Sequence, residues 1–159
     1  MHISIITVGK VREQYLIHGI DEYMKRLQRY ATVVIIEVAE EQVPESLSAA
    51  EQQQAKNREG ERMLKAIRDS QYLIALAMQG KQFTSEQFAD HLQTLLLNGR
   101  SDLVFLIGGS LGLADDVLRR ADLQLSFGKM TFPHQVMRMI LLEQIYRGCK
   151  IIRGEPYHK

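Results

Sequence analysis

The sequence of 159 residues contains a single cysteine, Cys149. One cysteine cannot form a disulfide within the chain, and it excludes a zinc site built from several cysteines. We therefore expect the protein in a reducing compartment, of which the cytoplasm is the simplest. Because Cys149 lies within an apolar helical pattern, we interpret it as a core residue and not as a nucleophile.

Membrane segments and targeting signals are also lacking. No apolar run approaches the roughly 18 residues that a membrane-spanning helix requires, so we expect no membrane contact. The N-terminal MHISIITVGK lacks the basic segment and cleavage site of a signal peptide, and is predicted to form a strand. With 45% apolar and 25% charged residues, the chain has the composition of a folded globular protein. Its length is that of one domain, residues 1–159.

The net charge is small but unevenly distributed. A formal charge of +1 argues against a general nucleic-acid binder. Residues 129–159 nevertheless carry six Lys or Arg and two acids, a net of +4, which leaves −3 for the first 128 residues. Positive charge therefore gathers in the C-terminal fifth, which indicates an anionic partner, although a basic tail can also serve solubility alone.

Strand and helix patterns alternate along the whole chain. Continuous apolar runs predict buried strands at 2–8, 33–38, 72–78, 103–107 and 123–127. Helical periodicity lies between and after them at 13–30, 48–68, 84–98, 114–121 and 134–150, and two of these helices open with capping boxes. This alternation predicts an α/β fold, a mostly parallel sheet covered by helices on both faces.

The last predicted helix, residues 134–150, is apolar over an unusually wide arc. One sheet face cannot cover such a helix, so we expect a second copy of the chain to do so; burial inside a monomer is the alternative. Arg138 falls within this arc, and we expect it either to reach solvent or to be held by a partner, through structural pairing or through a role in binding.

A glycine-rich turn, GGSLGL at 108–113, follows the predicted strand 103–107. Its glycine spacing differs from the dinucleotide-binding fingerprint, and no Walker A sequence occurs. Glycines at the carboxyl end of a parallel strand still allow a ligand to approach the backbone. The strand ends near Leu76 and Phe127 should lie on the same edge, so we predict a pocket there for a flat ring.

Several motifs occur together in a characteristic order: VGK at 8–10, EGERML at 59–64, LIGGSLGL at 106–113, SFGKMTFPHQVMR at 126–138 and RGEPYHK at 153–159. With them the whole chain resembles the SPOUT class of methyltransferases, and within it the bacterial enzymes that methylate N3 of a pseudouridine in 23S ribosomal RNA. The resemblance implies a C-terminal trefoil knot, an obligate homodimer, S-adenosylmethionine as the methyl donor, and no metal.

The resemblance also implies which residues bind the cofactor: Leu76, Gly108, Phe127, Gly128, Lys129, Met130, Thr131 and Phe132. Main-chain groups of this loop are expected to hold the adenine, with apolar side chains packed around it. Methyl transfer to a ring nitrogen requires positioning and a way to remove the N3 proton.

The C-terminal tail is predicted to meet the RNA beside the cofactor loop of the other subunit. Tyr157 can stack on a base, while Arg153 and Lys159 can contact phosphate. His158 is predicted to accept the N3 proton, or only to orient the base. Arg147 is predicted to hold the RNA, with a helix salt bridge to Glu143 as the alternative.

Other interpretations stay open from the sequence. His134 is interpreted as structural. A regulatory dimer could bind S-adenosylmethionine without transferring methyl, although a sensor has no need of a basic, aromatic tail beside the cofactor. A SPOUT enzyme could also act on another RNA, such as tRNA. Because the chain has no added RNA-binding domain, we predict the assembled ribosome, and not free ribosomal RNA, as the substrate.

Overall fold

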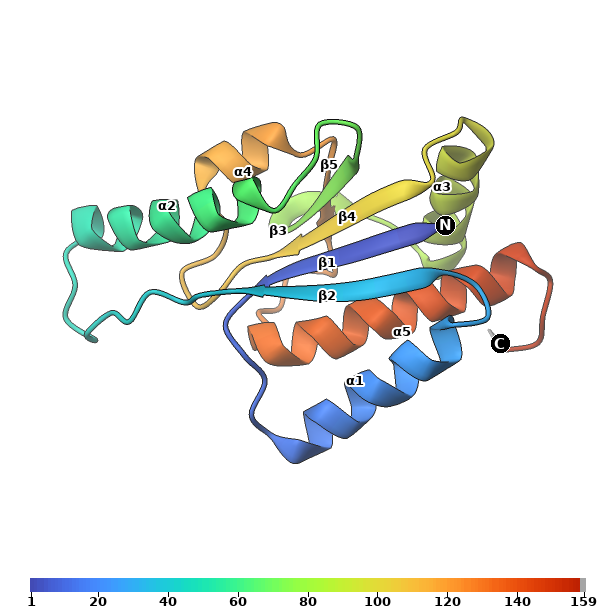
Figure 1. Cartoon of the computed structure of the whole chain (residues 1–159), viewed down its shortest axis with the longest axis horizontal. Coiled ribbons are helices and arrows are strands. Elements are labelled where there is room, and N and C mark those ends of the chain that lie inside the picture. The colour runs from blue at the N-terminus through green and yellow to red at the C-terminus, as the bar shows by residue number, and fades with distance from the viewer. Residues whose placement is uncertain (158–159) are drawn as a thin grey trace.

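The computed structural model describes residues 1–157, which form one five-stranded parallel sheet with the strand order β2-β1-β4-β3-β5 (Figure 1). The strands are β1 (His2–Val8), β2 (Thr32–Val38), β3 (Tyr72–Gln82), β4 (Asp102–Ile107) and β5 (Leu123–Ser126). The helices are α1 (Gln14–Leu27), α2 (Ala49–Lys65), α3 (Ser85–Leu97), α4 (Asp115–Arg120) and α5 (His134–Ile152). The α/β class with a parallel sheet is confirmed. Among the described residues, no helix combines the length and apolarity needed to cross a membrane.

Helices cover both faces of the sheet, as the continuous apolar strands predict. In β1, Ile3 and Ile5 point into the core that α1, α3 and α5 share, whereas Ile6 and Val8 point toward α2 and α4. Successive side chains of a strand alternate between faces, so a strand buried on both sides must be apolar throughout. Figure 1 shows α1 and α5 on one side and α2 and α4 on the other.

Both predicted capping boxes are present and set the starts of α2 and α3. The Ser48 hydroxyl accepts a hydrogen bond from the Glu51 amide, and the Thr84 hydroxyl accepts one from the Gln87 amide. In each case the side chain three residues on bonds back to the cap amide. Two N–H groups that the helix leaves unpaired are satisfied in this way.

Strand β3 runs four residues beyond its predicted end, because its backbone bulges. Leu125 of β5 pairs first with Leu76 and then again with Lys81, so residues 77–80 leave the ladder between them. Gly80 makes this possible: a Cβ there would lie 2.6 Å from the Gln124 carbonyl carbon. The polar residues of this segment resemble a loop in sequence, and only the neighbouring strand defines the pairing.

Helix α5 is more fully covered within one chain than its sequence predicts. All of its residues are buried or partly buried, because α5 packs against both α1 and α3 on the sheet. The chain itself therefore supplies much of the covering surface that we assigned to a second copy. The width of the apolar arc does not by itself require a homodimer, and the homodimer stays a prediction.

Arg138 is buried, and two groups of the same chain hold it in place. Its side chain is 2% exposed; Nη1 lies 2.7 Å from Glu37 Oε1, and Nη2 donates to the Gly9 carbonyl at 3.2 Å. Gly9 and Glu37 lie at the carboxyl ends of β1 and β2. Arg138 thus fixes the first turns of α5 to that edge of the sheet.

We predict that Arg138→Met destabilises the protein by about 1–3 kcal/mol, because the Gly9 carbonyl loses its donor and Glu37 loses its counter-ion. Urea denaturation measures the loss. The control is Arg119→Met, which removes an exposed pair with Asp116 and should cost less than about 1 kcal/mol. Equal costs for the two variants would contradict the anchoring role of Arg138.

Candidate functional site

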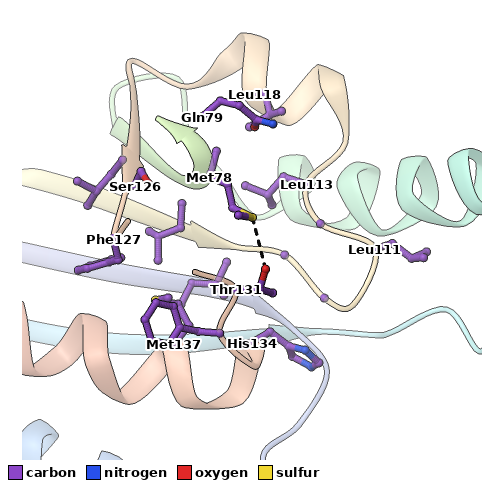
Figure 2. A pocket seen from close by; sticks show the side chains of 18 of the residues that line it. Met78, Gln79, Leu111, Leu113, Leu118, Ser126, Phe127, Thr131, His134 and Met137 are labelled. Atoms are coloured by element: carbon purple, nitrogen blue, oxygen red, sulfur yellow. Dashed lines mark hydrogen bonds between the residues drawn. The ribbon is translucent and has the colours of Figure 1, made fainter. Parts of the chain in front are cut away.

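A cavity of about 510 Å³ opens where the carboxyl ends of β3, β4 and β5 meet the start of α5 (Figure 2). Its walls come from residues 76–79, from the glycine-rich turn after β4, and from the segment that follows β5. The predicted pocket formed by three strand ends is therefore present. Its volume lies within the roughly 300–1,000 Å³ range of small-molecule sites.

The cavity has unusually apolar walls for a surface feature. Met78, Met130 and Phe132 remain 52%, 79% and 38% exposed, and all three line it. Thr131 donates a hydrogen bond to the Met78 sulfur at 3.8 Å, which joins the loop after β5 to the bulge of β3. Large apolar side chains gathered in a hollow are suited to cover an apolar ring.

Two glycines of the cavity wall, Gly108 and Gly128, occupy positions where a side chain is disfavoured. A Cβ on Gly108 would lie 2.6 Å from the carbonyl carbon of Gly112, so the turn closes only without a side chain. Gly128 has a φ of +123°, which favours glycine. The Ser126 hydroxyl accepts from the Gly128 amide at 3.1 Å, and this bond fixes the turn after β5.

The structure brings together most of the residues predicted to bind the cofactor. Those that line the cavity are Leu76, Gly108, Phe127, Gly128, Met130, Thr131 and Phe132. Lys129 is exposed and is not among the lining residues. The geometry is thus as expected for seven of the eight positions, while their cofactor contacts stay a prediction.

Sequence reasoning missed several lining residues, among them Lys56 of α2, Leu113, Leu118, His134 and Met137. Lys56 lies far from the other wall segments in sequence, and no local pattern marks it. His134 and Met137 could have been found, because residues three apart in a helix share a face, and both follow directly on the predicted cofactor loop.

His134 occupies the first position of α5, beside the loop that carries Thr131 (Figure 2). Its ring is half-buried, and this burial is the main reason that its pKa is lowered from 6.5. Arg138 lowers the pKa further, whereas Glu40 and Glu13 act in the opposite direction. The neutral imidazole is therefore the dominant form at pH 7.

Arg147 of α5 and Tyr157 of the tail both bind Glu143. Arg147 Nη2 lies 2.6 Å from Glu143 Oε1, and the Tyr157 hydroxyl donates to the same oxygen at 3.1 Å. The Arg147 guanidinium also lies 4.7 Å from the centre of the Tyr157 ring. The salt bridge that we gave as the alternative for Arg147 is present within α5. The hydrogen bond from Tyr157 to Glu143 and the contact of Arg147 with the Tyr157 ring hold the tail against α5.

This tail cluster lies far from the cavity of the same chain. Arg153 packs over the ring of Tyr30, which precedes β2, so the cluster sits at the amino ends of the strands. Figure 1 shows α5 running from the cavity edge of the sheet to the opposite edge. Arg147 follows His134 by 13 residues in α5, a rise of about 20 Å. His158 and Lys159 lie outside the described residues.

Neither a metal site nor a reactive thiol is found in the described part of the chain. No group of three or more His, Cys, Asp or Glu among residues 1–157 is placed to hold an ion. Cys149 is buried in the core, as predicted, and burial raises the pKa of its thiol to about 11.

The family model described as "Predicted SPOUT methyltransferase" matches residues 1–158. The chain belongs to the SPOUT methyltransferase family. Two proteins named ribosomal RNA large subunit methyltransferase H, from Alkaliphilus oremlandii and Enterococcus faecalis, are 60% and 55% identical to this SPOUT chain over 159 residues. Each alignment covers 100% of this chain and 100% of the relative.

A solved structure supports the SPOUT fold at lower similarity. A probable methylase family protein from Haemophilus influenzae is 12% identical, with a TM-score of 0.52 over 99% of this chain and 70% of its own. At that identity the likeness concerns the fold alone.

Glu59, in the EGERML segment of α2, is a buried carboxyl group beside the glycine-rich turn. It is 3% exposed, and its Oε2 accepts a hydrogen bond from the Glu41 amide at 3.0 Å. Its Oε1 has no hydrogen-bond partner within residues 1–157. Burial is the main cause that raises the Glu59 pKa from 4.5, and Glu40 and Glu41 raise it further.

We predict that the stability of the Glu59→Gln variant, relative to wild type, increases as the pH rises. A carboxyl group with a raised pKa in the folded state contributes stability below its ordinary pKa, and this contribution is lost as the pH rises through the folded-state value. Between pH 4 and pH 8 the variant should gain on the order of 1 kcal/mol relative to wild type, measured by urea denaturation. The exposed Glu61→Gln is the control. A difference in unfolding free energy between Glu59→Gln and wild type that does not change with pH would contradict the prediction.

Proposed function

We propose that this protein transfers a methyl group from S-adenosylmethionine to N3 of a pseudouridine in 23S ribosomal RNA. The observation that carries the proposal is the cavity, whose walls come from the two motif segments that follow β4 and β5. Support also comes from the relatives: proteins named for the methylation of large-subunit ribosomal RNA are 55% to 60% identical to the chain over its full length.

The residues of the cavity fit the proposed cofactor. Adenine is a flat, largely apolar ring with polar edges, and the exposed Met130 and Phe132 offer it apolar surfaces. The backbone around Gly108 and Gly128 can be approached closely, since neither position carries a side chain. Main-chain N–H and C=O groups at these turns are the expected partners of the polar ring edges.

The bound cofactor would supply a methyl group already activated on a sulfonium. The protein residues then have two tasks. The apolar walls and fixed turns hold the reacting partners in place and limit the access of water. A further group must take the N3 proton, because N3 of a pseudouridine lies between two carbonyls and is mostly protonated at neutral pH.

We propose that the tail of one subunit contacts the RNA at the cavity of the other subunit. Within one chain Arg147, Arg153 and Tyr157 lie at the end of α5 opposite the cavity, so a role for them at the cavity requires a homodimer. Tyr157 would stack on a base, while Arg147, Arg153 and Lys159 would contact phosphate and His158 would face the substrate base. The C-terminal trefoil knot is part of the same proposal.

The assembled ribosome is the proposed substrate, and the cytoplasm the place of action. The chain carries a net charge of only +1 and is one small domain. With so small a net charge, we expect it to gain little affinity from phosphate contacts alone. A large preformed RNA and protein surface would provide the missing recognition area.

We predict that the purified protein transfers labelled methyl from S-adenosylmethionine to ribosomes from cells that lack it, with label in 23S RNA. A chain truncated after Pro156 should lose at least about 100-fold in rate, because it lacks the proposed substrate contacts. This truncation retains Glu155, whose carboxylate binds Tyr30 and Lys150, so the fold of the tail base is preserved.

Three further measurements complete the test. Equal cofactor binding by the two proteins, measured by calorimetry, shows that the truncation spares the cavity. Naked 23S RNA should be a much poorer substrate than ribosomes, and equal methylation of both would contradict the ribosome proposal. Cofactor binding without transfer to any ribosomal RNA would favour a sensor or an enzyme that acts on another RNA.

A further inference from the structure

His134 is the histidine that lines the cavity among residues 1–157. Its backbone position is fixed by Pro133 before it and by Arg138 one turn later, which anchors α5 to Gly9. No hydrogen bond is found for either ring nitrogen in the described part of the chain. A half-buried, unbonded imidazole at a cavity wall is free to bind a ligand or to take a proton.

The proposed reaction needs such a proton acceptor. The N3–CH3 bond forms while the bond between sulfur and the methyl group breaks, and the N3 proton must pass to a base. Its electron pair then stays on the ring, and the methylated base leaves uncharged. Water can take the proton, but a positioned base contributes about 10²–10⁴-fold to such steps.

Other ionisable side chains on the cavity lining are less suited to this role. The lining includes Lys56 and Asp115 from α2 and α4, on the sheet face opposite α5. A lysine ammonium has no free lone pair, and an exposed aspartate is a weak base. Imidazole has an ordinary pKa much closer to neutral pH than either.

Burial keeps the ring of His134 neutral and thus able to accept a proton, and three charged groups also act on it. They are Arg138 on α5, Glu40 after β2 and Glu13 before α1; burial and Arg138 outweigh the two carboxylates. The N-terminal end of α5 also disfavours the protonated ring. The two carboxylates can stabilise the positive charge once the ring has taken a proton.

We propose that His134 accepts the N3 proton of the substrate base during methyl transfer, and that His158 of the tail orients the base. This inference rests on the proposed function and gives a role to a residue that its sequence context suggests is structural. His134 lies at the wall of the cofactor cavity, where a base brought to the methyl group would arrive.

The test is chemical rescue of His134→Ala by free imidazole. We expect a loss of about 100-fold or more in the rate of methyl transfer to ribosomes, with cofactor affinity changed less than about threefold. Imidazole should raise the rate of the His134→Ala variant at least about tenfold, because it can enter the space that the ring vacates. The controls are His18→Ala on the exposed face of α1, which should keep its rate, and His158→Ala, which imidazole should not rescue.

Several outcomes would overturn the proposal. They are a nearly normal rate in His134→Ala, no rescue despite normal cofactor binding, or rescue of His158→Ala instead. If His134→Ala does not fold, His134→Asn provides a second test. The wild-type rate should rise with pH through an inflection below pH 6.5, and the Asn variant should lack that inflection; its persistence would also overturn the proposal. Absence of transfer by wild-type protein would instead refute the proposed function.

Discussion

The parallel alignment of the strands is the constraint on which the rest of the structure depends. In a parallel sheet all carboxyl ends lie at one edge, so chain segments that are distant in sequence meet there. Leu76 lies in β3 where the bulge begins, Gly108 follows β4 and Phe127 follows β5. The strand order places all three around one cavity. Arg138 fixes α5 to the same edge through Gly9 and Glu37, and this positions His134 at the wall.

Much of this architecture could be predicted because the decisive signals are local. Strands buried on both faces must be apolar throughout, and residues such as Ile5 and Ile6 show this directly. The capping boxes at Ser48 and Thr84 define helix starts through bonds within four residues. The pocket could be predicted because the carboxyl ends of parallel strands share one edge of the sheet, and this required no knowledge of side-chain positions.

Features that depend on distant neighbours could not be predicted in this way. The bulge of β3 exists because Leu125 pairs twice, and the close approach of Gly80 to Gln124 has no local signature. The cover that α1 and α3 provide for α5 depends on how the helices pack, so the apolar arc alone overstated the need for a partner. Lys129 and His134 show the same limit: they belong to one short sequence motif, but His134 lines the cavity and Lys129 does not.

The two ends of α5 are distinct surfaces. At one end His134 and Met137 line the cavity, and at the other Glu143 and Arg147 hold Tyr157. A tail fixed so far from its own cavity can serve catalysis only at the cavity of another subunit. The proposed homodimer thus follows more strongly from the position of the tail than from the apolar width of the helix.

The central claim is that the cavity at the strand ends holds S-adenosylmethionine. Hydrogen exchange with and without saturating cofactor tests it most directly, since bound ligand slows exchange of the amides that it contacts or orders. We predict protection in residues 76–79, 107–113 and 125–134. Saturated binding with protection only in residues 9–13 and 37–42, which border a second cavity, would contradict the account.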